Sequence, residues 1–203
     1  MDQEEPFRTL LIWGLLAVLP VVVYHRLKAH RSREPLDRRQ EGLFILATLR
    51  PIGLAFFVGL VLYLVNPARM AWASVAIPAA LRWAGLAAIP AAGVLLFWTL
   101  RSLGANLTDT VVTRKAHTLV VKGPYRWVRH PFYDCVALLL FAISLAAANW
   151  YLLLTGSLVL TLLVVRTSRE EERLLARFGD DYRAYMARTN RFVPTRHSGA
   201  RRP

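Results

Sequence analysis

Five apolar stretches constrain what this chain can fold into more than any other feature. They run over about residues 10–24, 43–65, 84–100, 136–148 and 150–165. A helix that crosses a bilayer needs roughly 20 apolar residues, and shorter stretches reach that length when flanking aromatic and basic side chains extend them. Five such helices in 203 residues leave no polar faces to cover them in water. The sequence therefore predicts an all-α, polytopic membrane helix bundle of about five transmembrane helices.

Only Asn149 separates the last two stretches. They are predicted to form a tight helical hairpin with Asn149 and Trp150 at the membrane interface. The first stretch does not read as a signal peptide, because Asp2, Glu4 and Glu5 precede it where a signal peptide is basic.

The distribution of positive charge predicts the topology. The chain holds 26 Lys and Arg against 13 Asp and Glu, a net charge of +13. All basic residues except Arg8, Arg50, Arg69 and Arg82 fall within residues 26–39, 101–129 and 166–202, which five spans place on one side. Positively charged loops stay in the cytoplasm, so we expect the N-terminus outside and the C-terminus cytoplasmic, with no nucleic-acid partner.

Arg50 lies inside the second stretch beside Pro51, and its position has two interpretations. An ionisable residue within a span often faces a wet cavity or a partner. Its position near the start of the stretch favours instead a side chain that reaches the cytoplasmic interface.

Several kinds of site are not indicated. The single Cys135 excludes an intramolecular disulfide, and the spacing of histidines and carboxylates suggests no metal site. Glycine-rich nucleotide-binding loops of the GxGxxG or GxxxxGK[ST] type do not occur.

Chemistry-bearing residues gather in two blocks of the predicted cytoplasmic side. The first, residues 117–133, contains two histidines, two tyrosines and a tryptophan around a Gly123-Pro124 turn signal. Pro131 stops any helix arriving from residue 127, so we expect His130 and Tyr133 in an irregular segment before the fourth span. Each residue alone could be a loop histidine or an interfacial aromatic.

The second block begins where the fifth stretch ends. Arg166 and Glu170 are i,i+4 neighbours on one helix face, and Glu171 and Glu172 follow. We expect Gly179 to end this helix before a short helix over residues 180–188. An ordinary solvated face of salt bridges is the simpler interpretation of the block by itself.

Together, the two blocks resemble the isoprenylcysteine carboxyl methyltransferase family and its phospholipid methyltransferase relatives. The matching residues are His117, Leu119, Val120, Gly123, Pro124, Tyr125, Arg126, Arg129, His130, Pro131, Tyr133, Arg166, Glu170, Glu171, Phe178, Gly179, Tyr182, Tyr185, Arg191, Phe192 and Pro194. The resemblance covers about residues 100–194, whereas the first three stretches match only in being hydrophobic.

The resemblance implies methyl transfer from S-adenosylmethionine within the membrane, with the cofactor bound from the cytosol by a C-terminal helical lobe. It implies that Arg166 and Glu170 are catalytic: Arg166 faces the acceptor, and Glu170 also contacts the cofactor. The implied cofactor-binding residues are His117, Thr118, Leu119, Val120, Gly123, Tyr125, His130, Pro131, Phe132, Tyr133, Glu170 and Glu171.

The nature of the acceptor rests on simple chemistry. A planar guanidinium such as that of Arg166 holds a carboxylate with two hydrogen bonds. Methylation of a carboxylate needs alignment and desolvation, whereas an amine acceptor also needs a general base. We therefore favour O-methylation of a lipophilic carboxylate that arrives through the bilayer. The alternatives are a phospholipid N-methyltransferase, an NADPH-dependent membrane reductase on a similar scaffold, and a non-catalytic protein.

The expected organisation has three parts. Residues 1–100 hold three transmembrane helices and a basic loop, residues 101–194 form the catalytic region with the cofactor-binding loop, the hairpin and the C-terminal helices, and residues 195–203 are a basic tail. The Ala-, Leu- and Arg-rich composition suggests a bacterial inner membrane. Neither the acceptor nor a protein partner is identified by the sequence.

Overall fold

The computed structural model describes residues 4–30, 43–104 and 118–194, and these are helical throughout most of their length. The elements are α1 (Glu5–His30), α2 (Leu43–Val65), the 3₁₀ helix η2 (Pro67–Ala73), α3 (Ala79–Leu103), the 3₁₀ helix η4 (Gly123–Arg126), α4 (Pro131–Ala147) and α5 (Trp150–Arg188). In these ranges the β-structure consists of two isolated bridges, Ser74 with Asn149 and Val128 with Asn190. The predicted all-α fold is confirmed.

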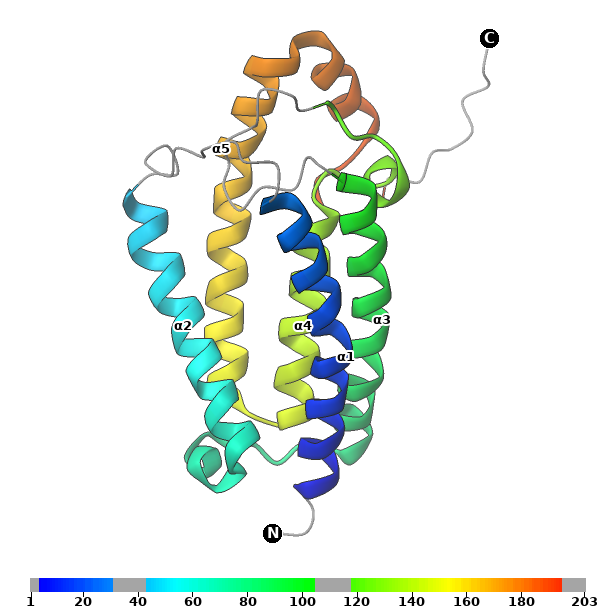
Figure 1. Cartoon of the computed structure of the whole chain (residues 1–203). Coiled ribbons are helices and arrows are strands. Elements are labelled where there is room, and N and C mark those ends of the chain that lie inside the picture. The colour runs from blue at the N-terminus through cyan, green and yellow to red at the C-terminus, as the bar shows by residue number, and fades with distance from the viewer. Residues whose placement is uncertain (1–3, 31–42, 105–117, 195–203) are drawn as a thin grey trace.

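Four of the described helices, α1, α2, α3 and α5, are long and apolar enough to cross a membrane. The fifth, α4, is apolar but spans only 17 residues. The helix α5 has 39 residues, about 58 Å at 1.5 Å per residue, which exceeds the roughly 30 Å of a bilayer core. Its polar second part therefore extends beyond the other helices, as Figure 1 shows.

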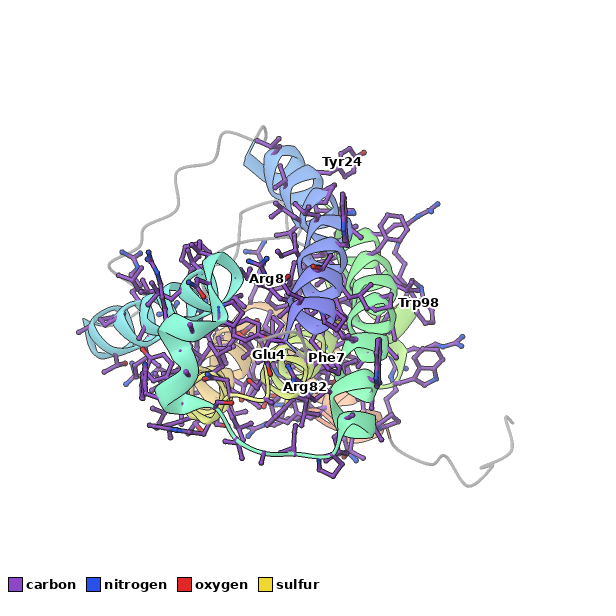
Figure 2. The ribbon with its side chains drawn as sticks, turned by 90° about the horizontal axis from the view of Figure 1, so that it is seen from below. Glu4, Phe7, Arg8, Tyr24, Arg82 and Trp98 are labelled. Carbon is purple, nitrogen blue, oxygen red and sulfur yellow. The ribbon has the colours of Figure 1, made fainter. Side chains whose placement is uncertain are left out.

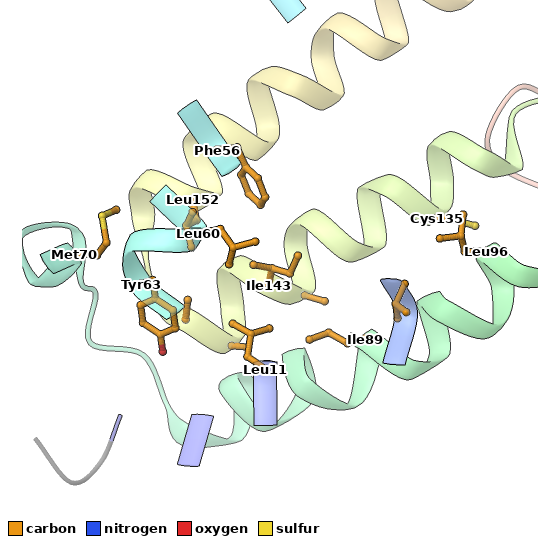
Figure 3. Close-up of a cluster of buried hydrophobic side chains, with 14 of the residues drawn as sticks. Leu11, Phe56, Leu60, Tyr63, Met70, Ile89, Leu96, Cys135, Ile143 and Leu152 are labelled. Carbon is orange, nitrogen blue, oxygen red and sulfur yellow. The ribbon is translucent and has the colours of Figure 1, made fainter. Parts of the chain in front are cut away.

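The helices form a bundle in which α4 joins two groups (Figure 1). On one side α4 packs against α3, which packs against α1, and on the other side it packs against α5, which packs against α2. The core between them is made of aliphatic side chains such as Leu11, Ile89, Ile143 and Leu152, all buried (Figure 3). The most extensive contacts thus follow the order α1, α3, α4, α5 and α2, and α1 also touches α4 and α2.

Glycines allow close helix approach in this core. A Cβ at Gly85 of α3 would lie 2.8 Å from the carbonyl oxygen of Ala142 and 2.8 Å from the amide nitrogen of Ala146, both in α4. Small residues at helix interfaces let backbones pack closely, which is a main source of helix association inside lipid. The α3–α4 contact therefore depends on the missing side chain of Gly85.

The predicted hairpin between α4 and α5 is confirmed, and its turn is as short as the sequence suggested. Ala148 adopts a left-handed conformation with φ 46°, and Asn149 caps α5 by accepting a hydrogen bond from the Leu152 amide at 3.1 Å. The Asn149 side chain also donates to the carbonyl of Met70 at 3.3 Å. Asn149 is thus buried as a tie between the hairpin and η2, while Trp150 is exposed and packs edge-on against Trp72.

A polar cluster fastens the opposite end of the bundle from the polar end of α5, around the start of α1 (Figure 2). Arg82 donates from both terminal nitrogens to the two carboxylate oxygens of Glu4, each at 2.7 Å, and Tyr63 donates to the same carboxylate at 3.0 Å. Arg82 also donates to the carbonyl of Ala146 at 3.1 Å and lies 3.8 Å above the ring of Phe7. This N-terminal cluster of Glu4, Phe7, Tyr63 and Arg82 connects α1, α2, α3 and α4.

Candidate active site

The first block forms a tight turn that leads directly into α4. Gly123 opens η4 with φ 62°, and a Cβ there would lie 2.1 Å from the hydroxyl oxygen of Ser102. Glycine is required because of both the backbone conformation and the space. No helix enters Pro131 from residues 127–130, as predicted, and Pro131 is itself the first residue of α4. A proline is well tolerated there because its missing N–H has no helical partner.

The expectation of an irregular segment through Tyr133 is therefore wrong for that residue. His130 precedes the helix with φ −124° and ψ 53°, but Tyr133 lies in the first turn of α4. The helix begins at Pro131, ahead of the apolar stretch that begins at residue 136. The consequence is that Tyr133 has a fixed direction, toward α5.

The three consecutive glutamates of α5 lie in three different environments, because successive helical residues point about 100° apart. Glu170 is half-buried and accepts a hydrogen bond from the Tyr133 hydroxyl at 2.8 Å. Glu171 is buried, and Glu172 is exposed. The two blocks of the sequence thus meet at Tyr133 and Glu170.

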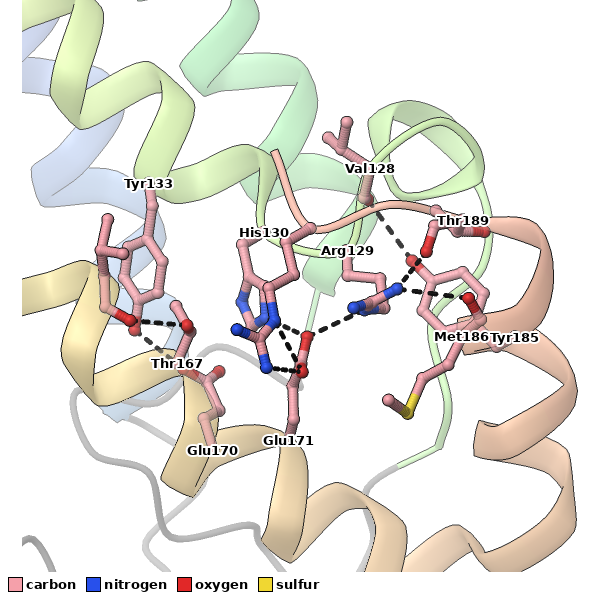
Figure 4. A network of polar contacts seen from close by, with 12 residues as sticks. Val128, Arg129, His130, Tyr133, Thr167, Glu170, Glu171, Tyr185, Met186 and Thr189 are labelled. Atoms are coloured by element: carbon pink, nitrogen blue, oxygen red, sulfur yellow. Dashed lines mark hydrogen bonds and ion pairs between the residues drawn. The ribbon is translucent and has the colours of Figure 1, made fainter. Parts of the chain in front are cut away.

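Glu171 is the centre of a second contact between the blocks (Figure 4). Its Oε1 atom accepts from Arg129 Nε at 2.8 Å and lies 3.1 Å from His130 Nε2. Its Oε2 atom accepts from Arg191 Nε at 2.9 Å and Arg191 Nη2 at 2.7 Å. We refer to Glu171, Arg129, His130 and Arg191 as the Glu171 cluster.

This cluster keeps the Glu171 carboxylate ionised. Burial by itself raises the pKa of a carboxyl group, but the hydrogen bonds from His130, Arg191 and Arg129 outweigh burial and lower the pKa of Glu171 to about 2. Since Glu171 is only 4% exposed, its negative charge depends on these three partners.

A returning segment, residues 189–192, completes the cluster and is here called the C-terminal strap. The helix α5 bends at Gly179, which has φ 53°, and its last part turns back toward the ends of α3 and α4 (Figure 1). The predicted break at Gly179 is therefore a kink between two helical parts. The strap then runs beside the first block: the Arg129 amide donates to the Asn190 carbonyl at 2.8 Å and the His130 amide donates to the Arg191 carbonyl at 3.0 Å.

Side chains strengthen the contact between the strap and the first block. The Arg129 guanidinium donates to the Thr189 carbonyl and, at 3.3 Å, to the Met186 carbonyl. The Phe192 ring centroid lies 5.8 Å from that of His130. No role is predicted for the strap from the sequence, although Arg191, Phe192 and Pro194 are among the residues that match the family and are a signal that could have indicated one.

Three buried tyrosines surround this region. The Tyr185 hydroxyl donates to the Tyr125 carbonyl at 2.5 Å, which fixes η4 to the last part of α5. Burial, followed by the charge of Glu170, raises the pKa of Tyr125 well above its ordinary value. The hydroxyl of Tyr182 is buried and has no hydrogen-bond partner among the described residues, although the charges of Glu171 and Glu170 act on it. Tyr182 was likewise given no role from the sequence.

The remaining candidate residues lie around these contacts. Arg166 is half-buried one helical turn before Glu170, close enough for its charge to act on the Tyr133 hydroxyl. Pro131 is buried, whereas Phe132 is half-buried beside Tyr133 with ring centroids 6.0 Å apart. Thr118 is exposed, and Leu119 and Val120 are half-buried in the segment before η4. His117 lies outside the described residues, and Arg50 is exposed on α2.

Sequence comparisons connect these features to known proteins. The uncharacterized protein YpbQ of Bacillus subtilis is 26% identical over 175 residues, which cover 83% of this chain and 98% of YpbQ. The cobalt-zinc-cadmium resistance protein CzcN of Cupriavidus metallidurans is 34% identical over 123 residues, which cover 56% of this chain. That match spans 54% of the length of CzcN.

A solved structure with a similar fold and a family model point to the same family of proteins. The solved structure of the eukaryotic intramembrane Ras methyltransferase ICMT, without a monobody, has the same fold with a TM-score of 0.52 and 20% identity, over 91% of this chain and 67% of that one. The model of the isoprenylcysteine carboxyl methyltransferase family matches residues 84–176, a range that contains Tyr133, Arg166, Glu170 and Glu171. Over residues 84–176 the chain is thus similar to the isoprenylcysteine carboxyl methyltransferase family.

Proposed function

We propose that this protein is an integral membrane methyltransferase that uses S-adenosylmethionine to methylate a carboxylate on a lipophilic acceptor. The observation that carries the proposal is the contact between the two blocks, in which Tyr133 donates to Glu170 at 2.8 Å with Arg166 one turn away on the same helix. The match of residues 84–176 to the model of a methyltransferase family supports the class of reaction.

The residues around this contact suit S-adenosylmethionine, which combines a cationic sulfur with a carboxylate, an amine and an aromatic base. An anion, Glu170, and buried aromatic side chains, Tyr125 and Tyr133, are present to match the cation and the base. The buried Tyr182 hydroxyl, which no described residue satisfies, adds a polar group in need of a partner. The donor set therefore fits this cofactor.

In this proposal each catalytic residue acts by position and charge. The bound cofactor supplies an activated methyl group on a cationic sulfur. Glu170, oriented by Tyr133, stabilises that positive charge, and Arg166 holds the acceptor carboxylate in line through its planar guanidinium. The surrounding apolar helices exclude water, which would otherwise solvate the carboxylate and weaken its nucleophilicity.

The other candidate residues form the rest of the proposed cofactor site. Gly123 and the segment from His117 to Val120 offer backbone groups, and the ring of His130 stacks on Tyr133 with an interplanar angle of 10° and centroids 5.5 Å apart. We place this catalytic region in residues 101–194, with the helices of residues 1–100 shaping the path of the acceptor from the bilayer and residues 195–203 as a basic tail.

Cofactor binding tests the donor. Calorimetry on the purified protein should detect S-adenosylmethionine binding, and Glu170→Gln should weaken that binding by a factor of about 10–100, the loss expected for a hydrogen-bonded charge. Glu172→Gln is the matched control, because Glu172 lies on the same helix but is exposed. Equal binding by both variants, or binding of NADPH instead, would contradict the proposal.

The methylated product tests the acceptor. Labelled methyl groups transferred to lipid extracts should be released by mild alkali, as esters are and methylated amines are not. Arg166→Gln should raise the KM for the acceptor with little change in cofactor affinity. Label that resists alkali would contradict carboxylate methylation and favour N-methylation.

We also propose a bacterial inner membrane with the C-terminus in the cytoplasm. The positive charges of the polar end of α5 support this orientation. A C-terminal fusion to green fluorescent protein should fluoresce, and a C-terminal alkaline phosphatase fusion should be inactive. The reverse pattern would overturn the orientation.

A further inference from the structure

Glu171 has used its hydrogen-bonding capacity entirely within the protein. A carboxylate offers about four lone-pair positions, and Glu171 receives four contacts, from Arg129 Nε, His130 Nε2, Arg191 Nε and Arg191 Nη2, at 2.7–3.1 Å. It is 4% exposed. No position is left for a ligand, so the role of Glu171 has to be exerted through the side chains that it holds.

The contact with His130 has a chemical consequence. An ionised carboxylate only accepts hydrogen bonds, and Glu171 is ionised, so the proton of a neutral His130 must lie on Nε2. The other ring nitrogen, Nδ1, is then a hydrogen-bond acceptor. Among residues 4–30, 43–104 and 118–194, no side chain or backbone group donates to Nδ1.

The ring plane of His130 is also fixed. Tyr133 stacks on it with an interplanar angle of 10°, and Phe192 of the strap packs at 5.8 Å. Its backbone amide is held by the Arg191 carbonyl at 3.0 Å. The strap and Glu171 therefore set the position, the plane and the tautomer of one imidazole.

We infer that Glu171 and Arg191 are positioning residues that hold His130 with its proton on Nε2, so that Nδ1 accepts a hydrogen bond from an N–H or O–H group of the bound cofactor. The inference deepens the proposed function and rests on it for the identity of the ligand. It also makes residues 189–192, which lie beyond the matched range 84–176, part of the site.

The test combines a spectroscopic and a binding measurement on the full chain in detergent micelles. Nitrogen NMR of ¹⁵N-histidine-labelled protein, with the His130 signals assigned by loss in His130→Gln, reports which ring nitrogen carries the proton. In the wild type, a single Nε2–H tautomer is expected. Arg191→Ala should give a mixture of tautomers and should weaken S-adenosylmethionine binding about tenfold, as expected when an orienting charge-assisted hydrogen bond is lost.

Two further variants separate positioning from stability. Arg191→Lys restores one donor to Glu171 and should recover part of both effects. Arg183→Ala is the control, because this arginine is exposed and pairs only with Asp180 in the described structure, and it should change neither measurement. Since the Arg191 side chain is 43% exposed, its truncation should shift the unfolding temperature little.

The outcomes are distinct. An unchanged tautomer with unchanged cofactor affinity in Arg191→Ala would overturn the inference. If the wild type does not bind S-adenosylmethionine, the proposed function fails, and the tautomer shift in Arg191→Ala still decides whether the strap positions His130. Weakened S-adenosylmethionine binding with an unchanged His130 tautomer would also overturn the inference, because the strap would then affect binding without positioning His130.

Discussion

Two carboxylate–arginine clusters hold this bundle at opposite ends, and they differ in the polar groups that lie beside them with hydrogen-bonding capacity still unused. At the start of α1, the Glu4 carboxylate accepts hydrogen bonds from Arg82 and Tyr63. Arg82 also donates to the Ala146 carbonyl and lies over the Phe7 ring. At the far end, the Glu171 carboxylate is hydrogen-bonded to Arg129, His130 and Arg191 (Figure 4).

The surroundings of the two clusters show their different purposes. In the described structure, the polar groups of Glu4, Tyr63 and Arg82 contact one another and the Ala146 carbonyl, which is what a tie between helix ends requires. Beside Glu171 lie groups with capacity to spare: Nδ1 of His130, the hydroxyl of Tyr182 and the carboxylate of Glu170. The same ion-pair chemistry therefore fastens helices at one end and supports a candidate binding site at the other.

The largest expected effect separates the two ends directly. Glu171→Ala leaves Arg129 and His130 buried without their anion, and breaking a buried pair in this way costs about 3–5 kcal/mol. Thermal unfolding in detergent should show this loss, together with loss of S-adenosylmethionine binding. Retained binding at temperatures where the variant is folded would contradict a supporting role for Glu171.

Acid should remove part of the same stabilisation. The pKa of Glu171 is about 2 in the folded protein, below its ordinary value of 4.5, so the unfolded chain takes up the proton first. The contribution is thus fully present above about pH 5 and is lost as the pH falls from 4.5 toward 2. The free energy of unfolding measured over this pH range should fall more steeply for the wild type than for Glu171→Gln. Parallel profiles for the two proteins would contradict a lowered pKa of Glu171 in the folded state.

Glu4→Ala should be milder and purely structural. Its side chain is 35% exposed, so water can solvate part of Arg82 once the carboxylate is gone, and we expect a loss of about 1–3 kcal/mol. Cofactor affinity should stay within about twofold of the wild type, because the cluster lies at the other end. A large loss of affinity would show that the two ends are coupled.

The smallest expected effect concerns the turn at the site end. Gly123→Ala introduces a Cβ 2.1 Å from Ser102 Oγ at a residue with φ 62°, and should cost about 1–2 kcal/mol and weaken cofactor binding. Gly53→Ala is a control, since a Cβ there meets no atom within 4 Å. Equal stability and affinity in both variants would remove Gly123 from the site.

Much of the fold could be predicted from local patterns. The lengths of the apolar stretches predicted the helices, Asn149 indicated the hairpin, and Gly179 indicated the change of direction in α5. Pro131 was correctly interpreted as the end of any arriving helix, but the irregular segment was extended through Tyr133, whereas a proline is also well tolerated in the first turn of a helix and α4 begins at Pro131. The different environments of Glu170 and Glu171 could not be separated, because a run of three glutamates carries no sign of which face each one meets.

The sequence by itself determined that this chain is a membrane bundle, because hydrophobic length and the placement of charge act locally along the chain. Only the tertiary structure decided which charges meet. Glu4 and Arg82 are 78 residues apart, and Arg129 and Glu171 are 42 apart. Such contacts depend on how the helices pack and where α5 turns back. The tertiary structure therefore decides which carboxylate–arginine cluster only ties helices together and which one lies at the candidate site.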